Sequence, residues 1–320
     1  MQSELTGQTM ASDIIRIGTR GSQLAKAQAS EVRARLMAAH DLPEEAFEIE
    51  VISTTGDRIL DRPLSEVGGK GLFTKEIEAA LIDGRIDIAA HSSKDMATAS
   101  PEGLEVSAYL PREDVRDAFI GRTAATIDEL PHGATIGSAS LRRQSLLKRM
   151  RPDLKVITFR GNVQSRLRKL EEGQVDATLL ALAGLNRMAM QGVATEILEV
   201  ERFLPAPGQG AICIQNRIGD ERVHGLVAAI ADPRTTVALT AERAFLAELD
   251  GSCRTPIAAH AVLAEDGTVT LHGMILTPDG SRMHETRRTG IATDAEALGR
   301  LAGRDVLDAA GPGFFDGWGA

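Results

Sequence analysis

The sequence predicts an α/β fold in two consecutive halves, followed by a small α+β domain. Strand-like and helix-like segments alternate from residue 14 to residue 215, which is typical of βαβ units and a mainly parallel sheet. Breaks rich in Pro, Gly or charged residues interrupt the alternation at 111–117 and 203–210. After residue 255, three strand-like runs follow one another, and such a succession favours an antiparallel sheet.

In the first half, short apolar or alternating runs predict strands, and apolar residues spaced three to four apart predict helices. Leu24, Val32 and Leu36 share one face of the first helix, and Asp83-Gly84 is a stop signal for the second. We expect strands at 14–18, 47–52, 86–90 and 104–110, and helices at 23–40 and 72–82.

The same alternation restarts after the charged break, although no internal repeat of fixed period is visible. We expect strands at 117–121, 134–137, 155–159, 177–181 and 210–215, and helices at 141–150 and 162–172. In the last third we expect helices at 235–249 and 294–309, strands at 257–264, 268–276 and 283–289, and a loose Gly-rich tail at 311–320.

Composition excludes several classes of protein. The chain has 320 residues, a mass of 34.1 kDa, a net charge of −9 and only 3% aromatic residues, so it is a poor candidate for binding nucleic acid. Two cysteines exclude a disulfide framework and a Cys-rich zinc site. The longest apolar run, 177–185, is about half a membrane span, and residues 1–13 lack the apolar stretch of a secretory signal. We therefore expect a cytoplasmic protein that binds neither membrane nor nucleic acid.

Common nucleotide and metal motifs are missing. The segment Val67-Gly-Gly-Lys-Gly71 lacks the Ser or Thr and the earlier Gly of a P-loop. No G-x-G-x-x-G opens a helix after a strand, and the seven histidines are scattered. Neither a nucleotide nor a metal ion is expected.

Positive charge is concentrated in one segment. Residues 142–169 contain ten bases and one acid, in a chain whose remainder carries a net charge of −18. A solvated basic face is the simplest interpretation. However, Arg142 and Arg143 open a helix after a strand and a small loop, and Arg160 ends the next strand before another helix. Open α/β sheets bind ligands at such places, and Arg offers two-pronged binding to carboxylates. The pattern favours a small ligand with several carboxylates.

Similar placements occur in the first half. Arg20 and Ser22 follow the first strand, and His91-Ser-Ser-Lys-Asp95 follows the strand at 86–90. The Asp95 carboxylate could cap a helix or pair with Lys94. Facing a pocket lined with cations, it could instead stabilise a cationic intermediate or move protons.

The two cysteines have different surroundings. Cys213 lies between two isoleucines of a strand, which predicts a packed core thiol. Cys253 lies in a turn after a helix and next to Arg254, where a thiolate is favoured, although a loop thiol without a role remains open.

Taken together, the motifs resemble those of the porphobilinogen deaminase (hydroxymethylbilane synthase) family. The resemblance extends from about residue 14 to residue 260, with the motifs in family order. They are Ile17-Gly-Thr-Arg-Gly-Ser-Gln-Leu-Ala25, Gly56-Asp57, Val67-Gly-Gly-Lys-Gly-Leu-Phe73, Asp87-Ile-Ala-Ala-His-Ser-Ser-Lys-Asp95, Gly137-Ser-Ala-Ser-Leu-Arg-Arg-Gln144, Phe159-Arg-Gly-Asn162, Ala183-Gly-Leu-Asn-Arg187, Pro205-Ala-Pro-Gly-Gln-Gly210, Ala241-Glu-Arg243 and Gly251-Ser-Cys-Arg-Thr-Pro256.

The resemblance implies an α/β fold with two doubly wound domains like those of periplasmic binding proteins, plus a small C-terminal α+β domain. The implied domains are 13–112 with 208–230, then 113–207, and then 231–320, which carries the cofactor cysteine. The family's members are expected to be monomers.

The implied activity is that of a transferase. The family joins porphobilinogen units head to tail with loss of ammonia, and hydrolysis then releases the linear tetrapyrrole hydroxymethylbilane. Its cofactor is a dipyrromethane, which the resemblance places on Cys253 through a thioether. Loss of ammonia leaves a cationic azafulvene-like species, which Asp95 would stabilise as the catalytic residue. The expected contacts to cofactor and substrate are Arg20, Ser22, Ser92, Lys94, Ser138, Ser140, Arg142, Arg143, Arg160, Arg166, Arg187 and Gln209.

Two other functions fit parts of the sequence. A catalytically silent two-domain receptor for a polycarboxylate would account for the arginines but would leave Cys253 without a role. A thiol hydrolase would account for Cys253 but lacks a local histidine base.

Overall fold

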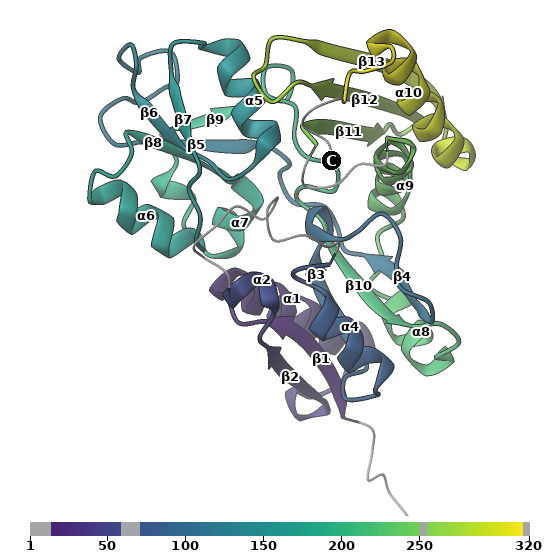
Figure 1. Cartoon of the computed structure of the whole chain (residues 1–320). Coiled ribbons are helices and arrows are strands. Elements are labelled where there is room, and N and C mark those ends of the chain that lie inside the picture. Colours follow the sequence, from purple (N-terminus) through teal and green to yellow (C-terminus); the bar gives the residue numbers. More distant parts are fainter. Residues whose placement is uncertain (1–13, 59–70, 250–254, 316–320) are drawn as a thin grey trace, which may run out of the picture.

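The structure is a computed structural model of the whole chain, and it describes residues 14–58, 71–249 and 255–315. In this part of the chain, no helix combines the length and the apolar character needed to cross a membrane. The described residues form three sheets, and Figure 1 shows their strands with helices around them.

The first sheet has five strands in the spatial order β2-β1-β3-β10-β4. Its strands are β1 (Ile15–Arg20), β2 (Phe47–Ile52), β3 (Ile88–Ser92), β4 (Leu104–Tyr109) and β10 (Ile212–Arg217). β1 is parallel to β2 and β3, and β10 is antiparallel to β3 and β4. Helices α1 (Gln23–His40) and α8 (Glu221–Ala228) pack on one face, and α4 (Lys75–Ile82) packs on the other. The sheet is therefore covered on both faces, as in doubly wound folds.

The second sheet repeats this arrangement in the order β7-β6-β8-β5-β9. Its strands are β5 (Asp117–Gly121), β6 (Thr135–Gly137), β7 (Lys155–Ile157), β8 (Ala177–Ala181) and β9 (Glu196–Leu198). Here β6 is parallel to β7 and β8, and β5 is antiparallel to β8 and β9. Helix α5 (Leu141–Met150) covers one face, and α6 (Val163–Glu171) and α7 (Leu182–Arg187) cover the other.

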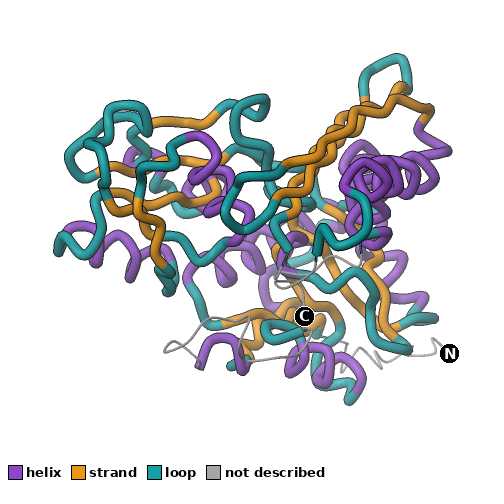
Figure 2. The backbone as a smooth tube through the Cα atoms, turned by 45° about the horizontal axis from the view of Figure 1, so that its top comes forward, coloured by secondary structure: helices purple, strands orange, loops and turns teal. Residues whose placement is uncertain are grey.

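The third sheet is antiparallel in the order β11-β12-β13 and packs against two helices. Its elements are β11 (Ile257–Leu263), β12 (Thr268–Leu276), β13 (Met283–Ile291), α9 (Pro233–Glu248) and α10 (Ala295–Ala310). Its core is shared with residues of the first half, such as Met96 and Tyr109. Ala258, Met274 and Leu276 pack instead into the core of the second half. The small domain therefore contacts both halves, and the backbone tube in Figure 2 shows its strands beside both groups.

The predicted α/β and α+β architecture is confirmed, and most expected elements are present. Helices 23–40 and 141–150 and strands 47–52, 117–121 and 268–276 have the expected bounds. Both helices begin at a serine N-cap, Ser22 and Ser140, whose hydroxyl accepts a backbone N–H three residues on. Short or polar elements were not predicted: α2 (Thr55–Arg58), α7, β9 and α8. The expectation of a loose tail is wrong at Phe314, which is 2% exposed because its ring packs into the core of the small domain.

Candidate active site

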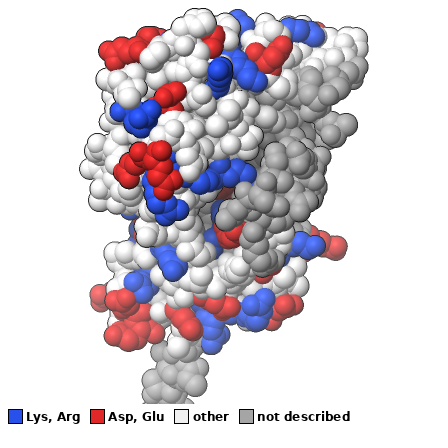
Figure 3. Space-filling view, turned by 60° about the vertical axis from the view of Figure 1, so that its left-hand side comes forward, with Lys and Arg blue, Asp and Glu red and all other residues white. Residues whose placement is uncertain are grey.

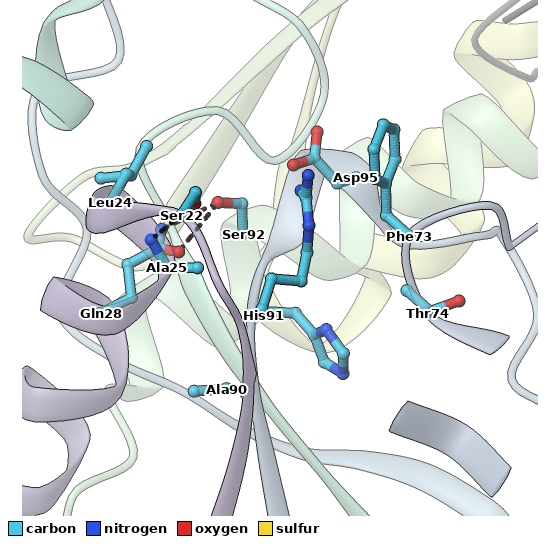
Figure 4. Close-up of a pocket in the computed structure, with 11 residues that line it drawn as sticks. Ser22, Leu24, Ala25, Gln28, Phe73, Thr74, Ala90, His91, Ser92 and Asp95 are labelled. Atoms are coloured by element: carbon cyan, nitrogen blue, oxygen red, sulfur yellow. Dashed lines mark hydrogen bonds between the residues drawn. The ribbon is translucent and has the colours of Figure 1, made fainter. Parts of the chain in front are cut away.

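The candidate site lies where the loops after β1 and β3 meet the segment that leads into α4. A pocket of about 60 Å³ is lined by Arg20, Ser22, Leu24, Ala25, Gln28, Phe73, Thr74, Ala90, His91, Ser92 and Asp95. Figure 4 shows the Asp95 carboxylate and the Phe73 ring at one end of this pocket and Ser22 at the other. A second, smaller pocket shares Leu24, Gln28 and Ser92 and reaches Lys94 and Arg187, which belong to different halves of the chain. The site therefore extends along the junction of the two halves.

Asp95 ends the short 3-10 turn η2 (Ser93–Asp95) directly after β3, and its side chain is exposed. It is not a helix cap, because Ser92 occupies the position before η2. The Lys94 ammonium donates its hydrogen bond to Gln209 Oε1 at 3.2 Å rather than to Asp95. The carboxylate is thus presented to the pocket, where it can accept a hydrogen bond from a ligand.

Lys94 is the cation next to this carboxylate. Burial by the surrounding protein and the positive charge of Arg143 lower the pKa of Lys94 to about 8, although Asp95 and Asp117 act in the opposite direction. Its neighbour Ser93 is 2% exposed, and the Ser93 hydroxyl has no hydrogen-bond partner. A half-buried ammonium without a direct carboxylate partner is suited to binding an anionic ligand.

The segment that holds Gln209 approaches the Lys94 loop closely. Gly208 has φ +76°, a left-handed conformation, and a Cβ at this position would lie 3.0 Å from Lys94 N. Only glycine fits both the conformation and the space. This close approach places Gln209, which is 1% exposed, within hydrogen-bond distance of Lys94.

Arg142 and Arg143 lie at the start of α5, as predicted, but both are buried and both bind Asp117. Arg142 Nη2 lies 2.7 Å from Asp117 Oδ2, and Arg143 Nη2 lies 2.5 Å from Asp117 Oδ1. Burial would raise the pKa of Asp117, but the charges of the two guanidinium groups outweigh it and hold this pKa well below its usual range. Asp117 is therefore ionised. The two arginines form an internal ion cluster, and their binding of substrate stays a prediction.

Arg160 and Arg166 flank the start of α6, whose N-cap is Asn162. Arg166 Nε donates to the Gly161 carbonyl at 2.8 Å. Burial and the charges of Arg143 and Arg160 lower the pKa of Arg166 to about 10, whereas the charge of Asp95 acts in the opposite direction. Arg166 therefore interacts electrostatically with cations of the second half and with Asp95 of the first half.

Arg20 lines the pocket and also forms an ion pair with Asp57 inside the protein. Its guanidinium forms an ion pair with Asp57 and lies 4.0 Å from the centre of the Phe73 ring. Burial would raise the pKa of Asp57, but hydrogen bonds from Arg20 and Thr54 outweigh it and lower this pKa. Ser92 binds Gln28, with Gln28 Nε2 at 2.8 Å from Ser92 Oγ.

The remaining predicted contacts are engaged within the protein. Arg187 Nε donates to Glu31 Oε2 at 3.0 Å, and Arg187 Nη2 donates to the Gly210 carbonyl, so Arg187 links α7 to α1 and to the returning chain. Ser138 is 2% exposed, and its hydroxyl accepts the backbone N–H of Ser140 at 3.2 Å.

Cys253 lies outside the described residues. Helix α9, which precedes this segment, is tied to the loop after Asp95, because Arg243 Nη2 donates to the carbonyls of Ala97 at 2.6 Å and Thr98 at 3.1 Å. The prediction for the other cysteine is confirmed. Cys213 is fully buried in β10, and burial raises the pKa of its thiol to about 12.

Sequence reasoning missed the acids that hold the arginines. Asp117, Glu31 and Asp57 lie on β5, α1 and α2, far along the chain from their partners. Asp117 offered a signal, since it is an acid at the start of an otherwise apolar strand. Glu31 looks like an ordinary surface acid in the sequence, and Asp57 was singled out only as part of the family motif Gly56-Asp57.

One face of the molecule has a hollow in which basic side chains are visible. Figure 3 shows Lys and Arg atoms in the hollow between the upper and lower parts of that face, next to atoms that are not described. A carboxylate acceptor at Asp95 beside Lys94 and Arg166 could bind a ligand that combines N–H donors with several carboxylates.

Comparison with known proteins identifies the family. The family model described as "Porphobilinogen deaminase, dipyromethane cofactor binding domain" matches residues 15–225, and "Porphobilinogen deaminase, C-terminal domain" matches residues 236–308. The chain belongs to the porphobilinogen deaminase family. A porphobilinogen deaminase of Nitrobacter hamburgensis is 57% identical over 299 residues, which are 93% of this chain and 94% of that protein.

Solved structures of periplasmic proteins are also similar to this chain. A VFT2 domain of Bordetella pertussis BvgS has a TM-score of 0.41 at 19% identity, covering 68% of this chain and 85% of the domain. A periplasmic substrate-binding protein of a Coxiella burnetii ABC transporter has a TM-score of 0.41 at 16% identity, covering 68% of this chain and 92% of that protein. The α/β assignment rests on the sheet order and strand directions given above.

The residues of this porphobilinogen deaminase family member fit the dipyrromethane named by the family model. Such a group has pyrrole N–H donors and carboxylate side chains. Asp95 is an exposed acceptor, Lys94 and Arg166 are nearby cations, and Ser22 and Ser92 line the same pocket as Asp95. The donor set therefore matches the group in both charge and hydrogen bonding.

Proposed function

We propose that this chain is a transferase that joins porphobilinogen units head to tail with loss of ammonia and releases hydroxymethylbilane. Family membership supports this activity. The observation that carries the proposal is the exposed Asp95 carboxylate at the junction of the halves, electrostatically coupled to Lys94 and Arg166. One acceptor among cations suits a substrate with one pyrrole N–H and two carboxylates per ring.

We propose that the dipyrromethane is attached to Cys253 by a thioether. When bound, this group supplies the pyrrole carbon to which the arriving unit is joined. The support is the tie between α9 and the loop after Asp95, which holds the helix before Cys253 against the site. The core position of Cys213 is unsuited to attachment, because its thiol is fully buried and protonated.

The side chains of this site have separate roles in the proposed reaction. Asp95 accepts the pyrrole N–H of the substrate and stabilises the positive charge that develops as the aminomethyl C–N bond breaks and ammonia leaves with the bonding electrons. Lys94, Arg160 and Arg166 bind acetate and propionate groups, each by charge-assisted hydrogen bonds. Ser22 and Ser92, which line the same pocket, supply neutral hydrogen bonds.

Intact mass and substrate consumption test the proposal together. The purified chain should be heavier than its sequence by two condensed pyrrole units and should convert porphobilinogen to hydroxymethylbilane and ammonia. The added mass should be absent from Cys253→Ser and present in the control Cys213→Ala, whose thiol lies in the core. A chain of bare mass that binds polycarboxylates without consuming porphobilinogen would support a receptor and contradict the proposal.

We further propose that the three sheets mark domains at 13–112 with 208–230, 113–207 and 231–320. The sheet membership of β5 and β10 supports two crossings of the chain between the first two domains. We also propose that the protein acts as a monomer in the cytoplasm.

A further inference from the structure

Asp117 is a buried carboxylate without a role in the proposed chemistry. It begins β5 and is fully buried, yet it accepts hydrogen bonds from three side chains. The donors are Arg142 Nη2 at 2.7 Å, Arg143 Nη2 at 2.5 Å, Arg143 Nε at 3.1 Å and Gln209 Nε2 at 3.0 Å. Burying one anion is costly unless it is paired in this way, so the cluster has a defined geometry.

Gln209 extends this cluster to the first half. Its Nε2 donates to Asp117, and its Oε1 accepts from Lys94 Nζ at 3.2 Å. An amide can serve both partners only in one orientation, with its oxygen toward the ammonium and its nitrogen toward the carboxylate. Gln209 Nε2 also donates to the Val115 carbonyl at 2.8 Å, so Asp117 and this carbonyl together fix the direction in which Gln209 faces Lys94.

The members of the cluster also affect one another through their charges, in addition to their hydrogen bonds. The Lys94 ammonium is affected by the like charges of Arg143 and Arg142 and by the opposite charges of Asp95 and Asp117. Without the Asp117 charge, two buried guanidinium groups would lack their counterion, and the Lys94 ammonium would face their repulsion with Asp95 alone as its acid.

We propose that Asp117 is a positioning residue, which holds Arg142, Arg143 and, through Gln209, Lys94 as one array at the junction of the halves. The inference rests on the proposed function, in which Lys94, a member of this array, binds a carboxylate of the substrate. Asp117 itself is too deeply buried to touch a ligand. It acts by neutralising part of the charge and by fixing the donors in place.

The test is Asp117→Asn, measured as turnover of porphobilinogen against pH in the complete protein. We expect KM to rise by at least about tenfold, the effect of one lost charge-assisted hydrogen bond. We also expect the alkaline limb of kcat/KM to move down by about one pH unit, because the Lys94 ammonium loses a stabilising anion and deprotonates more easily. The matched control is Asp153→Asn, which removes an acid that binds Arg151 in the same half.

A purely structural role for Asp117 would lower the melting temperature and leave the pH profile of the folded fraction unchanged, and this result would overturn the inference. If Asp117→Asn does not fold, the variant Gln209→Leu tests the inference instead. It removes the hydrogen bonds that join Asp117 to Lys94, while Arg142 and Arg143 can still bind Asp117. Its alkaline limb should move in the same direction, and an unchanged limb would overturn the inference. An inactive wild type would instead contradict the proposed function.

Discussion

The two α/β halves share one framework and differ in charge. In both sheets three strands run parallel and the fourth strand in spatial order, β10 or β5, is antiparallel. In both halves a serine after the first of these strands caps a helix. The loop after β2 leads to the acid Asp57 in α2, whereas the corresponding loop after β7 contains the base Arg160. The segments that follow corresponding strands of the two sheets therefore carry opposite charges.

The acids of the two halves also differ in exposure. Asp95, in the first half, lies in a loop and is exposed, while Asp117, in the second half, lies in a strand and is fully buried. An exposed carboxylate can meet a ligand, and a buried one can only organise the side chains around it. In the proposed reaction, the first half would therefore supply the reacting acid and the second half organised cations.

The largest effect should follow from the exposed acid. In Asp95→Asn we expect turnover of porphobilinogen to fall by about 100- to 1000-fold, since the variant lacks the charge that stabilises the developing cation. Steady-state kinetics and intact mass measure the turnover and the retained cofactor. The control Asp83→Asn removes an exposed acid beyond the end of α4 in the same half. Near-normal turnover of Asp95→Asn would remove Asp95 from the mechanism.

Substituting a cation of the second half should weaken the binding of substrate carboxylates. In Arg166→Met we expect kcat/KM to fall by about 10- to 100-fold, because a charge-assisted hydrogen bond contributes about 1.5–3 kcal/mol. Shorter enzyme-bound chains should accumulate, which intact mass would detect. Arg168→Met is the matched control, since Arg168 is exposed on the same helix. Equal effects of the two substitutions would contradict the assignment of cations to the second half.

A substitution of Lys94 tests whether this charged side chain of the site lowers the stability of the folded protein. Its folded pKa of about 8 lies below the ordinary value of 10.5, so its charged form is disfavoured in the folded state. This penalty is fully present below about pH 8 and disappears as the pH rises toward 10.5. We therefore expect Lys94→Met to raise the melting temperature by a few degrees at pH 7 while activity falls. A lower melting temperature at pH 7 would show that the ammonium stabilises the fold.

The contact between the halves should give the smallest effect. Glu31→Gln removes the charged partner of Arg187, whose side chain is 8% exposed. We expect a loss of about 1 kcal/mol, since the pair is partly screened by solvent, and a fall of a few degrees in melting temperature. Glu44→Gln serves as the control. The exposed Glu44 lies beyond the end of α1 and pairs with Arg33, which is on the same helix as Glu31. If both variants melt alike, the pair does not hold the halves together.

Local patterns predicted a helix best where it is long and begins at a recognisable cap. The helix at 23–40 was predicted to the residue, because its apolar spacing and its serine cap agree. Short elements such as α8, with 8 residues, and β9, with 3, were missed, since so few residues show no clear period and such elements depend on packing for their stability. The common order of the two sheets was also missed, because it arises from backbone topology without a sequence repeat.

By itself, the sequence determined the order of strands and helices, the concentration of bases at 142–169 and the family motifs. These are properties of neighbouring residues. Only the tertiary structure decided that Arg142 and Arg143 bind Asp117, that Arg187 binds Glu31 and that Asp95 is left exposed. Each of these ion pairs joins side chains more than 20 residues apart, and the choice among possible acids depends on which of them folding buries beside a guanidinium group.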